Sequence, residues 1–104
     1  MTQTLLDPAQ FREHAAAAAQ LLRTMANEHR LMILCRLGSG EQTVSELLAG
    51  TTLSQSALSQ HLAVLREDGL VATRRDGQAI YYRIDDPAAV QVIDTLAAIF
   101  CPED

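Results

Sequence analysis

The segment from residue 43 to residue 84 constrains the fold most, because helix signals there are followed at once by a hairpin signal. Two β-prone runs, Leu70–Arg75 and Ala79–Ile84, flank the turn Asp76-Gly77-Gln78. Asp-Gly between such runs is the strongest short-range signal for a β-hairpin, since glycine readily adopts the positive φ that tight hairpin turns need. We therefore expect a two-stranded wing in this part of the chain.

Two helices are predicted directly before the hairpin. Thr43 and Glu46 have the spacing of a capping box, and the helix that they open stops at Gly50. Ser54 can cap a second helix, Gln55–Glu67. Two short helices joined by a glycine-containing turn are typical of a helix-turn-helix.

Helices are also predicted on both sides of this segment. Asp7-Pro8 has the pattern of a capping residue followed by proline at the first helical position, and apolar residues then recur at steps of three and four. Asn27 can cap a second helix, which ends at Gly38. Asp86-Pro87 begins a last helix that is apolar almost all round, so one copy of the chain cannot cover it alone.

These elements predict a mainly α fold with a β-hairpin wing. We expect one winged helix-turn-helix domain over residues 1–104, with the order α-α-α-α-β-β-α. Its expected parts are the helix-turn-helix at 43–67, the wing at 70–84 and two outer helices at 8–25 and 87–100.

Composition excludes several classes of protein. Apolar residues make up 48% and charged residues 20%, which is a globular composition, and no apolar run approaches the ~18 residues of a membrane-spanning helix. The net charge of −5 argues against a generally adhesive nucleic-acid binder but permits local basic patches. The N-terminus has no secretion-signal pattern, and two cysteines are too few for a disulfide framework. We expect a cytoplasmic protein without a cofactor or a membrane partner.

The helix at 55–67 carries a polar face suited to DNA. Leu58, Leu62 and Leu65 share the opposite face and should pack inward. Hydroxyl and amide side chains can hydrogen-bond base edges and phosphates, although an isolated helix with such a face is more often simply solvated. The preceding short helix and the following hairpin favour DNA contact. The expected DNA-binding residues of this helix and its cap are Ser54, Gln55, Ser56, Ser59, Gln60 and His61.

His61 lies at the edge of the apolar stripe, so packing or phosphate contact is favoured over base reading for this residue. The predicted wing adds Arg74 and Arg75 beside its turn and Arg83 on the return strand. A basic wing can reach the adjacent minor groove or phosphates, although arginine at a strand edge can also serve solubility alone. Residues 54–83 have four arginines against three carboxylates, while the acidic excess lies in the last helix and tail. Double-stranded DNA is therefore the expected partner.

Three stretches together resemble the ArsR family of bacterial repressors: LLRTMANEHRLMILCRL at 21–37, LSQSALSQHLAVLREDGLV at 53–71, and Arg83 after IYY. The resemblance covers nearly the whole chain. It implies a homodimer that joins through its first and last helices and binds a palindromic operator. It also implies a sensor pair, because Cys35 and Cys101 resemble the dithiol of the persulfide-sensing branch, in which reactive sulfur species link the cysteines and release the DNA.

Without the resemblance, Cys35 fits a broad apolar face of its helix, where cysteine is commonly a small buried hydrophobic residue. The chain also departs from the metal-sensing members of the family. Those place paired cysteines in the helix before the recognition helix, where this chain has Thr43-Val44-Ser45-Glu46-Leu47. Others use Asp and His in the last helix, which here offers Asp94 and no histidine. We expect no metal site.

Several alternatives stay open at this point. A metal-responsive regulator, a general thiol-redox regulator and an anti-repressor share the same fold. An enzyme such as a sulfurtransferase or peroxidase is not expected, because the chain has no CxxC motif, no phosphate-binding loop and no constellation of acid–base residues. A protein-interaction module would differ from an operator binder in lacking a steep salt dependence.

Overall fold

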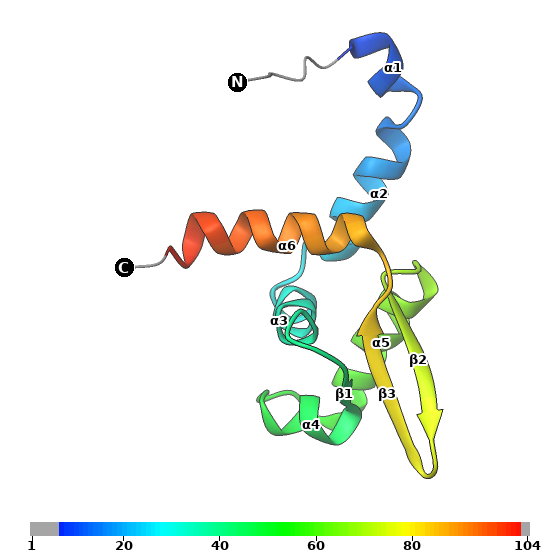
Figure 1. The fold of residues 1–104 in the computed structure, drawn as a ribbon, viewed down its shortest axis with the longest axis vertical. Helices are drawn as coiled ribbons and strands as arrows, with labels where there is room; N and C mark the ends of the chain where they lie inside the picture. The colour runs from blue at the N-terminus through cyan, green and yellow to red at the C-terminus, as the bar shows by residue number, and fades with distance from the viewer. Residues whose placement is uncertain (1–6, 103–104) are drawn as a thin grey trace.

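A computed structural model describes residues 7–102 of the chain. Its helices and strands follow the order of a winged helix-turn-helix, which confirms the expected fold class (Figure 1). The elements are α1 (Pro8–Arg12), α2 (Ala15–Met25), α3 (Glu28–Leu37), β1 (Gln42–Thr43), α4 (Val44–Ala49), α5 (Gln55–Glu67), β2 (Val71–Asp76), β3 (Ala79–Ile84) and α6 (Pro87–Phe100).

Helices α3, α4, α5 and α6 begin at the side-chain caps that the sequence predicts. The Asn27 side chain accepts hydrogen bonds from two backbone N–H groups of α3, and Ser54 and Asp86 each accept one at the starts of α5 and α6. Thr43 and Glu46 form the reciprocal bonds of a capping box at the start of α4. Because these bonds satisfy otherwise unpaired donors, each start is fixed locally.

The first helix differs from the prediction. The sequence predicts one helix over 8–25, but the structure divides it into α1 and α2, with a turn at Glu13 and His14. No residue of α1 is buried, and in Figure 1 this short helix stands apart from the core. The C-terminal end of α2 packs into the core through Met25, whereas α1 has no such contact, so nothing within one copy of the chain keeps the two halves collinear.

The sheet has three antiparallel strands in the order β1-β3-β2, one more than expected. The hairpin closes with Asp76 paired to Ala79, and Gly77 has a φ of +64°, as the Asp-Gly signal predicts. The additional strand, β1, pairs Gln42 and Thr43 with β3. It escapes sequence analysis because two residues carry no periodicity.

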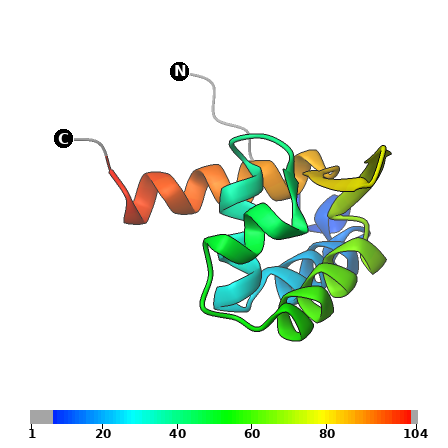
Figure 2. The same ribbon diagram turned by 90° about the horizontal axis from the view of Figure 1, so that it is seen from below.

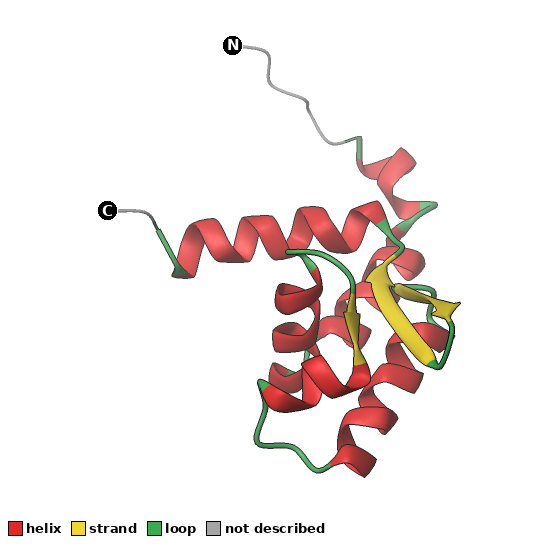
Figure 3. Ribbon diagram, turned by 60° about the horizontal axis from the view of Figure 1, so that its bottom comes forward, coloured by secondary structure: helices red, strands yellow, loops and turns green. Residues whose placement is uncertain are grey.

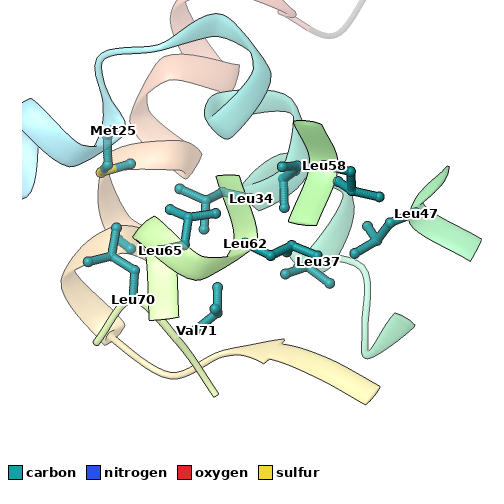
Figure 4. Close-up of a cluster of buried hydrophobic side chains, with 11 residues drawn as sticks. Met25, Leu34, Leu37, Leu47, Leu58, Leu62, Leu65, Leu70 and Val71 are labelled. Carbon is teal, nitrogen blue, oxygen red and sulfur yellow. The ribbon is translucent and has the colours of Figure 1, made fainter. Parts of the chain in front are cut away.

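The core lies where α3, α5 and the inner face of the hairpin meet (Figure 4). Leu58, Leu62 and Leu65 are buried as predicted, and Leu34 of α3 packs against them. The start of α6 closes this core with Ala89, the only residue of that helix that is buried. Most of α6 is thus left outside the core.

The molecule is extended for its length. Its radius of gyration is 15.5 Å, against roughly 13 Å for a compact domain of this size. Figures 1 and 2 show the reason, since α1 and the C-terminal half of α6 project from the rest. The apolar side chains of these helices are exposed, up to 75% for Phe100 and 61% for Ile99. Among residues 7–102, no helix is long and apolar enough to span a membrane.

Candidate nucleic-acid interface and paired cysteines

The N-terminal turns of α5 carry exposed polar side chains. In Figure 3 this end of the helix, which the loop after α4 leads into, lies at the periphery of the molecule. Gln55, Ser56, Ser59 and Gln60 are all exposed, whereas Leu58 between them is fully buried. The Ser54 hydroxyl accepts the Ala57 N–H at 3.1 Å, so it caps the helix. Burial on one side and exposure on the other fix which face of α5 is available to a ligand.

His61 has a different environment, because it is half-buried against α3. Its Nδ1 lies 3.3 Å from Nη1 of Arg30, and its ring centroid lies 5.6 Å from that of His29. Burial and then the charges of Arg30 and His29 lower the pKa of His61. Arg30 also donates to the Thr24 carbonyl at 2.6 Å, so this cluster joins α2, α3 and the middle of α5.

Arg36 holds the short helix α4 in place. Its guanidinium donates to the carbonyls of Leu47 and Glu46 at 3.3 and 3.0 Å, and to Oε1 of Gln42 at 3.2 Å. Gly50 permits this arrangement, because a Cβ built there would lie 1.3 Å from Nη1 of Arg36. No local pattern in the sequence indicates this role of Arg36, since only the fold brings its guanidinium to the end of α4.

The two wing arginines have different surroundings. Arg74 donates from Nε to both carboxylate oxygens of Glu41 at 2.9 Å, and its Nη2 lies 2.8 Å from Oε1. Its guanidinium carbon also lies 4.6 Å above the Tyr81 ring. The hydrogen bond from Arg74 lowers the pKa of Glu41. Arg75 is exposed on the opposite face of the strand, because side chains alternate along β2.

The two cysteines lie in one groove between α3 and α6. Both are free and exposed, which corrects the expectation of a buried face that includes Cys35. The groove has a volume of about 260 Å³ and an almost entirely apolar lining. Its lining residues are Leu31, Met32, Cys35, Ile93, Leu96, Ala97, Phe100 and Cys101. Cys35 is exposed because Ala89, near the start of α6, is the only buried residue of that helix, and the C-terminal half of α6 extends beyond the core (Figure 1).

Metal-ligating side chains do not gather in the part of the chain that the structure describes. Nowhere between residues 7 and 102 do three or more His, Cys, Asp or Glu side chains come close enough to hold a metal ion. The histidine pair His29 and His61 has Arg30 beside it rather than a further ligand.

Comparison with known proteins agrees with this architecture. Residues 27–73 match the family described as bacterial regulatory protein, arsR family. The chain is 47% identical over 89 residues to the transcriptional activator HlyU of Vibrio cholerae, which covers 86% of this chain and 82% of that protein. It is 46% identical over 93 residues to the biofilm growth-associated repressor of Agrobacterium fabrum, with coverage of 88% and 80%.

Solved structures give the same result in three dimensions. Reduced HlyU from Vibrio cholerae matches with a TM-score of 0.83 and 46% identity, over 88% of this chain and 97% of that one. The repressor BigR from Xylella fastidiosa matches with a TM-score of 0.87 and 39% identity, over 94% and 100%. These relatives are transcriptional regulators and not enzymes, and the family resemblance seen in the sequence is confirmed. The chain belongs to the bacterial ArsR family of transcriptional regulators.

Proposed function

We propose that this regulator is a homodimeric repressor that senses reactive sulfur species through Cys35 and Cys101. In the reduced state it binds a palindromic operator in the cytoplasm, and a bridge between the two cysteines releases the DNA. The observation that carries the proposal is that the only two cysteines of the sequence line one exposed groove between α3 and α6. One relative has been solved in a form described as reduced, which fits a redox-dependent state.

The groove has the chemistry that a sulfur-transfer reagent requires. Its lining is apolar apart from the thiols, which suits contact with a soft, polarisable sulfur atom. Both thiols are accessible from solvent. Cys101 lies between the end of α6 at Phe100 and Pro102. The backbone adjusts more easily at such a helix end than within the helix.

The chemical steps balance with persulfide as the only reagent. A thiolate of the pair attacks the outer sulfur of a persulfide RSSH, which leaves a protein persulfide and RSH. This persulfide and the second thiol are then oxidised together by a second RSSH, which is reduced to RSH and H₂S. The product is a trisulfide between Cys35 and Cys101. Direct oxidation of both thiols by one RSSH gives a plain disulfide with RSH and H₂S.

A second copy of the chain is the expected cover for the exposed apolar helices. Phe11 and Leu22 in the N-terminal helices are about half exposed, and Ile99 and Phe100 in α6 are more so. These helices project away from the wing and α5, so a dimer formed through them leaves both recognition helices free (Figure 1). A two-fold axis then presents two copies of α5 to half-sites one helical turn apart, about 34–36 Å.

Release follows from the position of the groove. A bridge would fasten the end of α6 to α3, and α3 belongs to the core that carries α5. Because α6 would also be part of the dimer interface, the bridge would change the distance between the two recognition helices. A change of a few ångströms disrupts binding at both half-sites at once.

The first experiment measures the intact mass of the reduced protein after glutathione persulfide or hydrogen peroxide, with operator binding in parallel. The operator is obtained by selection of random duplexes on the reduced protein. We expect persulfide to add sulfur and remove two hydrogens and to abolish binding. Cys35→Ser and Cys101→Ser, the matched variants, should each lose the bridge and keep binding after treatment.

Other outcomes separate the alternatives. A plain disulfide with both reagents would make the protein a general thiol-redox switch. No bridge with either reagent would reject the sensor pair. If the bridge forms but operator binding persists, the groove does not control DNA binding.

The DNA-reading residues are tested on the same operator. If Gln60 contacts a base edge, Gln60→Ala should relax specificity at one position by about 1–3 kcal/mol. Arg75→Ala should weaken binding to all sequences about equally, as expected for a phosphate contact. Unchanged affinity and specificity of Gln60→Ala would show that a different face of α5 meets the bases.

A further inference from the structure

A second groove lies between the recognition helix and the wing. It has a volume of about 470 Å³ and opens to solvent on the side of α5 that faces β3. Its lining residues are Ser59, Ala63, Arg66, Glu67 and Tyr82. Ser59, Ala63 and Arg66 follow one another at steps of four and three, so they form one stripe along the helix.

The strand register adds Arg75 to this side of the wing. Val71 is buried and pairs with Ile84, so these two residues mark the inner face of the hairpin. Tyr82 and Arg75 lie two and four residues along their strands from that pair, on the same face. Arg74 and Arg83 lie on the other face. In the part of the chain that the structure describes, Arg74 and Arg83 have ion-pair partners, whereas Arg66 and Arg75 have none.

The geometry of duplex DNA indicates which part of a bound duplex would lie in this groove. When α5 enters a major groove and the wing meets the adjacent minor groove, one sugar-phosphate strand separates the two. That strand must pass between α5 and the hairpin. Hydroxyl and guanidinium groups are the side chains that bind phosphate there.

We propose that the groove between α5 and the wing is a binding site for a backbone phosphate of DNA. Arg66 supplies the charge, Ser59 and Tyr82 supply hydroxyl donors, and Arg75 binds the next phosphate toward the wing tip. Glu67 at the rim opposes the ligand and limits its affinity. This site rests on the proposed DNA binding of the regulator, and it adds Arg66 and Tyr82 to the residues that the sequence suggested.

The test is the salt dependence of operator binding by the full-length reduced protein. The slope of log K against log salt is negative, and its magnitude decreases by about 0.9 for each phosphate that the protein no longer neutralises. A homodimer loses two such contacts in Arg66→Gln, so the magnitude of its slope should decrease by about 1.8. Arg66→Lys should keep most of the slope. Arg83→Gln removes the same charge from the opposite face of the wing and should reduce the slope less than Arg66→Gln does.

Two further measurements do not depend on removing Arg66. Glu67→Gln should tighten binding to all sequences. Single neutral methylphosphonates in the operator should weaken the wild type at each contacted phosphate of a half-site, and at one of these positions Arg66→Gln should show no additional loss. Circular dichroism and thermal unfolding verify that each variant is folded.

The results distinguish this site from DNA binding in general. An unchanged slope for Arg66→Gln would overturn the phosphate site while operator binding by the wild type stands. An equal reduction for Arg83→Gln would overturn its location in the groove. Absence of salt-dependent binding by the wild type would instead reject the proposed function itself.

Discussion

Gly50→Ala tests how α4 is held in the helix-turn-helix. Gly50 has ordinary backbone angles, with φ −100° and ψ 14°, so alanine meets no conformational barrier there. By itself the substitution should stabilise the protein by about 0.4–1 kcal/mol, because alanine reduces the freedom of the unfolded chain. The new Cβ, however, would lie 1.3 Å from Nη1 of Arg36.

The guanidinium is the flexible end of its side chain, so it can move away, and the cost is the hydrogen bonds that it leaves. Arg36 makes three hydrogen bonds to α4 and to Gln42, with lengths of 3.0–3.3 Å. At about 0.5–1 kcal/mol for each of these partly exposed bonds, their loss costs about 1.5–3 kcal/mol. The loss therefore outweighs the gain, and we expect a net destabilisation of about 1–2 kcal/mol.

The assay is a double-mutant cycle by urea unfolding at fixed protein concentration. Arg36→Ala removes the obstructing group, so Gly50→Ala in that background should become neutral or stabilising by about 0.4–1 kcal/mol. This reversal of sign is the decisive result. Destabilisation of similar size in both backgrounds would refute the reasoning, because the clash with Arg36 would then not be the cause.

Three further predictions concern the core and the titrating groups. Leu62→Ala should lower the free energy of unfolding by about 2–5 kcal/mol, whereas Val64→Ala on the exposed face of the same helix should change it by less than about 0.5 kcal/mol, both measured by urea unfolding. Hydrogen bonds from Thr24 and Gln20 lower the pKa of Asp68. The stability that its ionised carboxylate contributes is therefore present at neutral pH and is lost as pH falls below about 4. Asp68→Asn should abolish this loss of stability at acid pH. Burial lowers the pKa of His61, so the protein loses stability as pH falls below about 6.5 and the imidazole becomes protonated. The urea midpoint of His61→Gln should therefore differ less between about pH 7.5 and about pH 5.5 than that of the wild type.

Local signals in the sequence were sufficient for most of the fold. The caps at Asn27, Ser54 and Asp86 and the Asp-Gly turn act within a few residues, so their patterns predict helix starts and the hairpin directly. The leucines of α5 also fix its buried face, because helical periodicity and burial coincide there. These features are local, and local features can be predicted from one sequence.

What the sequence could not show depends on contacts between distant segments. The pairing of β1 with β3 and the ion pair between Glu41 and Arg74 each join residues more than thirty positions apart, a separation of 33 for the ion pair. The break between α1 and α2 follows from the lack of a packing partner, which periodicity does not report. The exposure of Cys35 depends on how far α6 covers α3. The apolar pattern of its helix predicted burial, and only the resemblance to a family indicated a sensing role for this cysteine.

The short strand β1 has a consequence for how an effector acts. Thr43 is both the end of β1 and the cap of α4, and Glu41, which directly precedes β1, binds Arg74 of the wing. Because α5 packs in the same core as α4 and the wing, the helix-turn-helix and the wing form one rigid unit. A bridge between Cys35 and Cys101 in the groove between α3 and α6 can move this unit as a whole but does not change its internal structure. Base preference within a half-site should therefore be the same in the reduced and the bridged states. Any duplexes that random selection recovers on the bridged protein should carry the same half-site consensus, with lower enrichment.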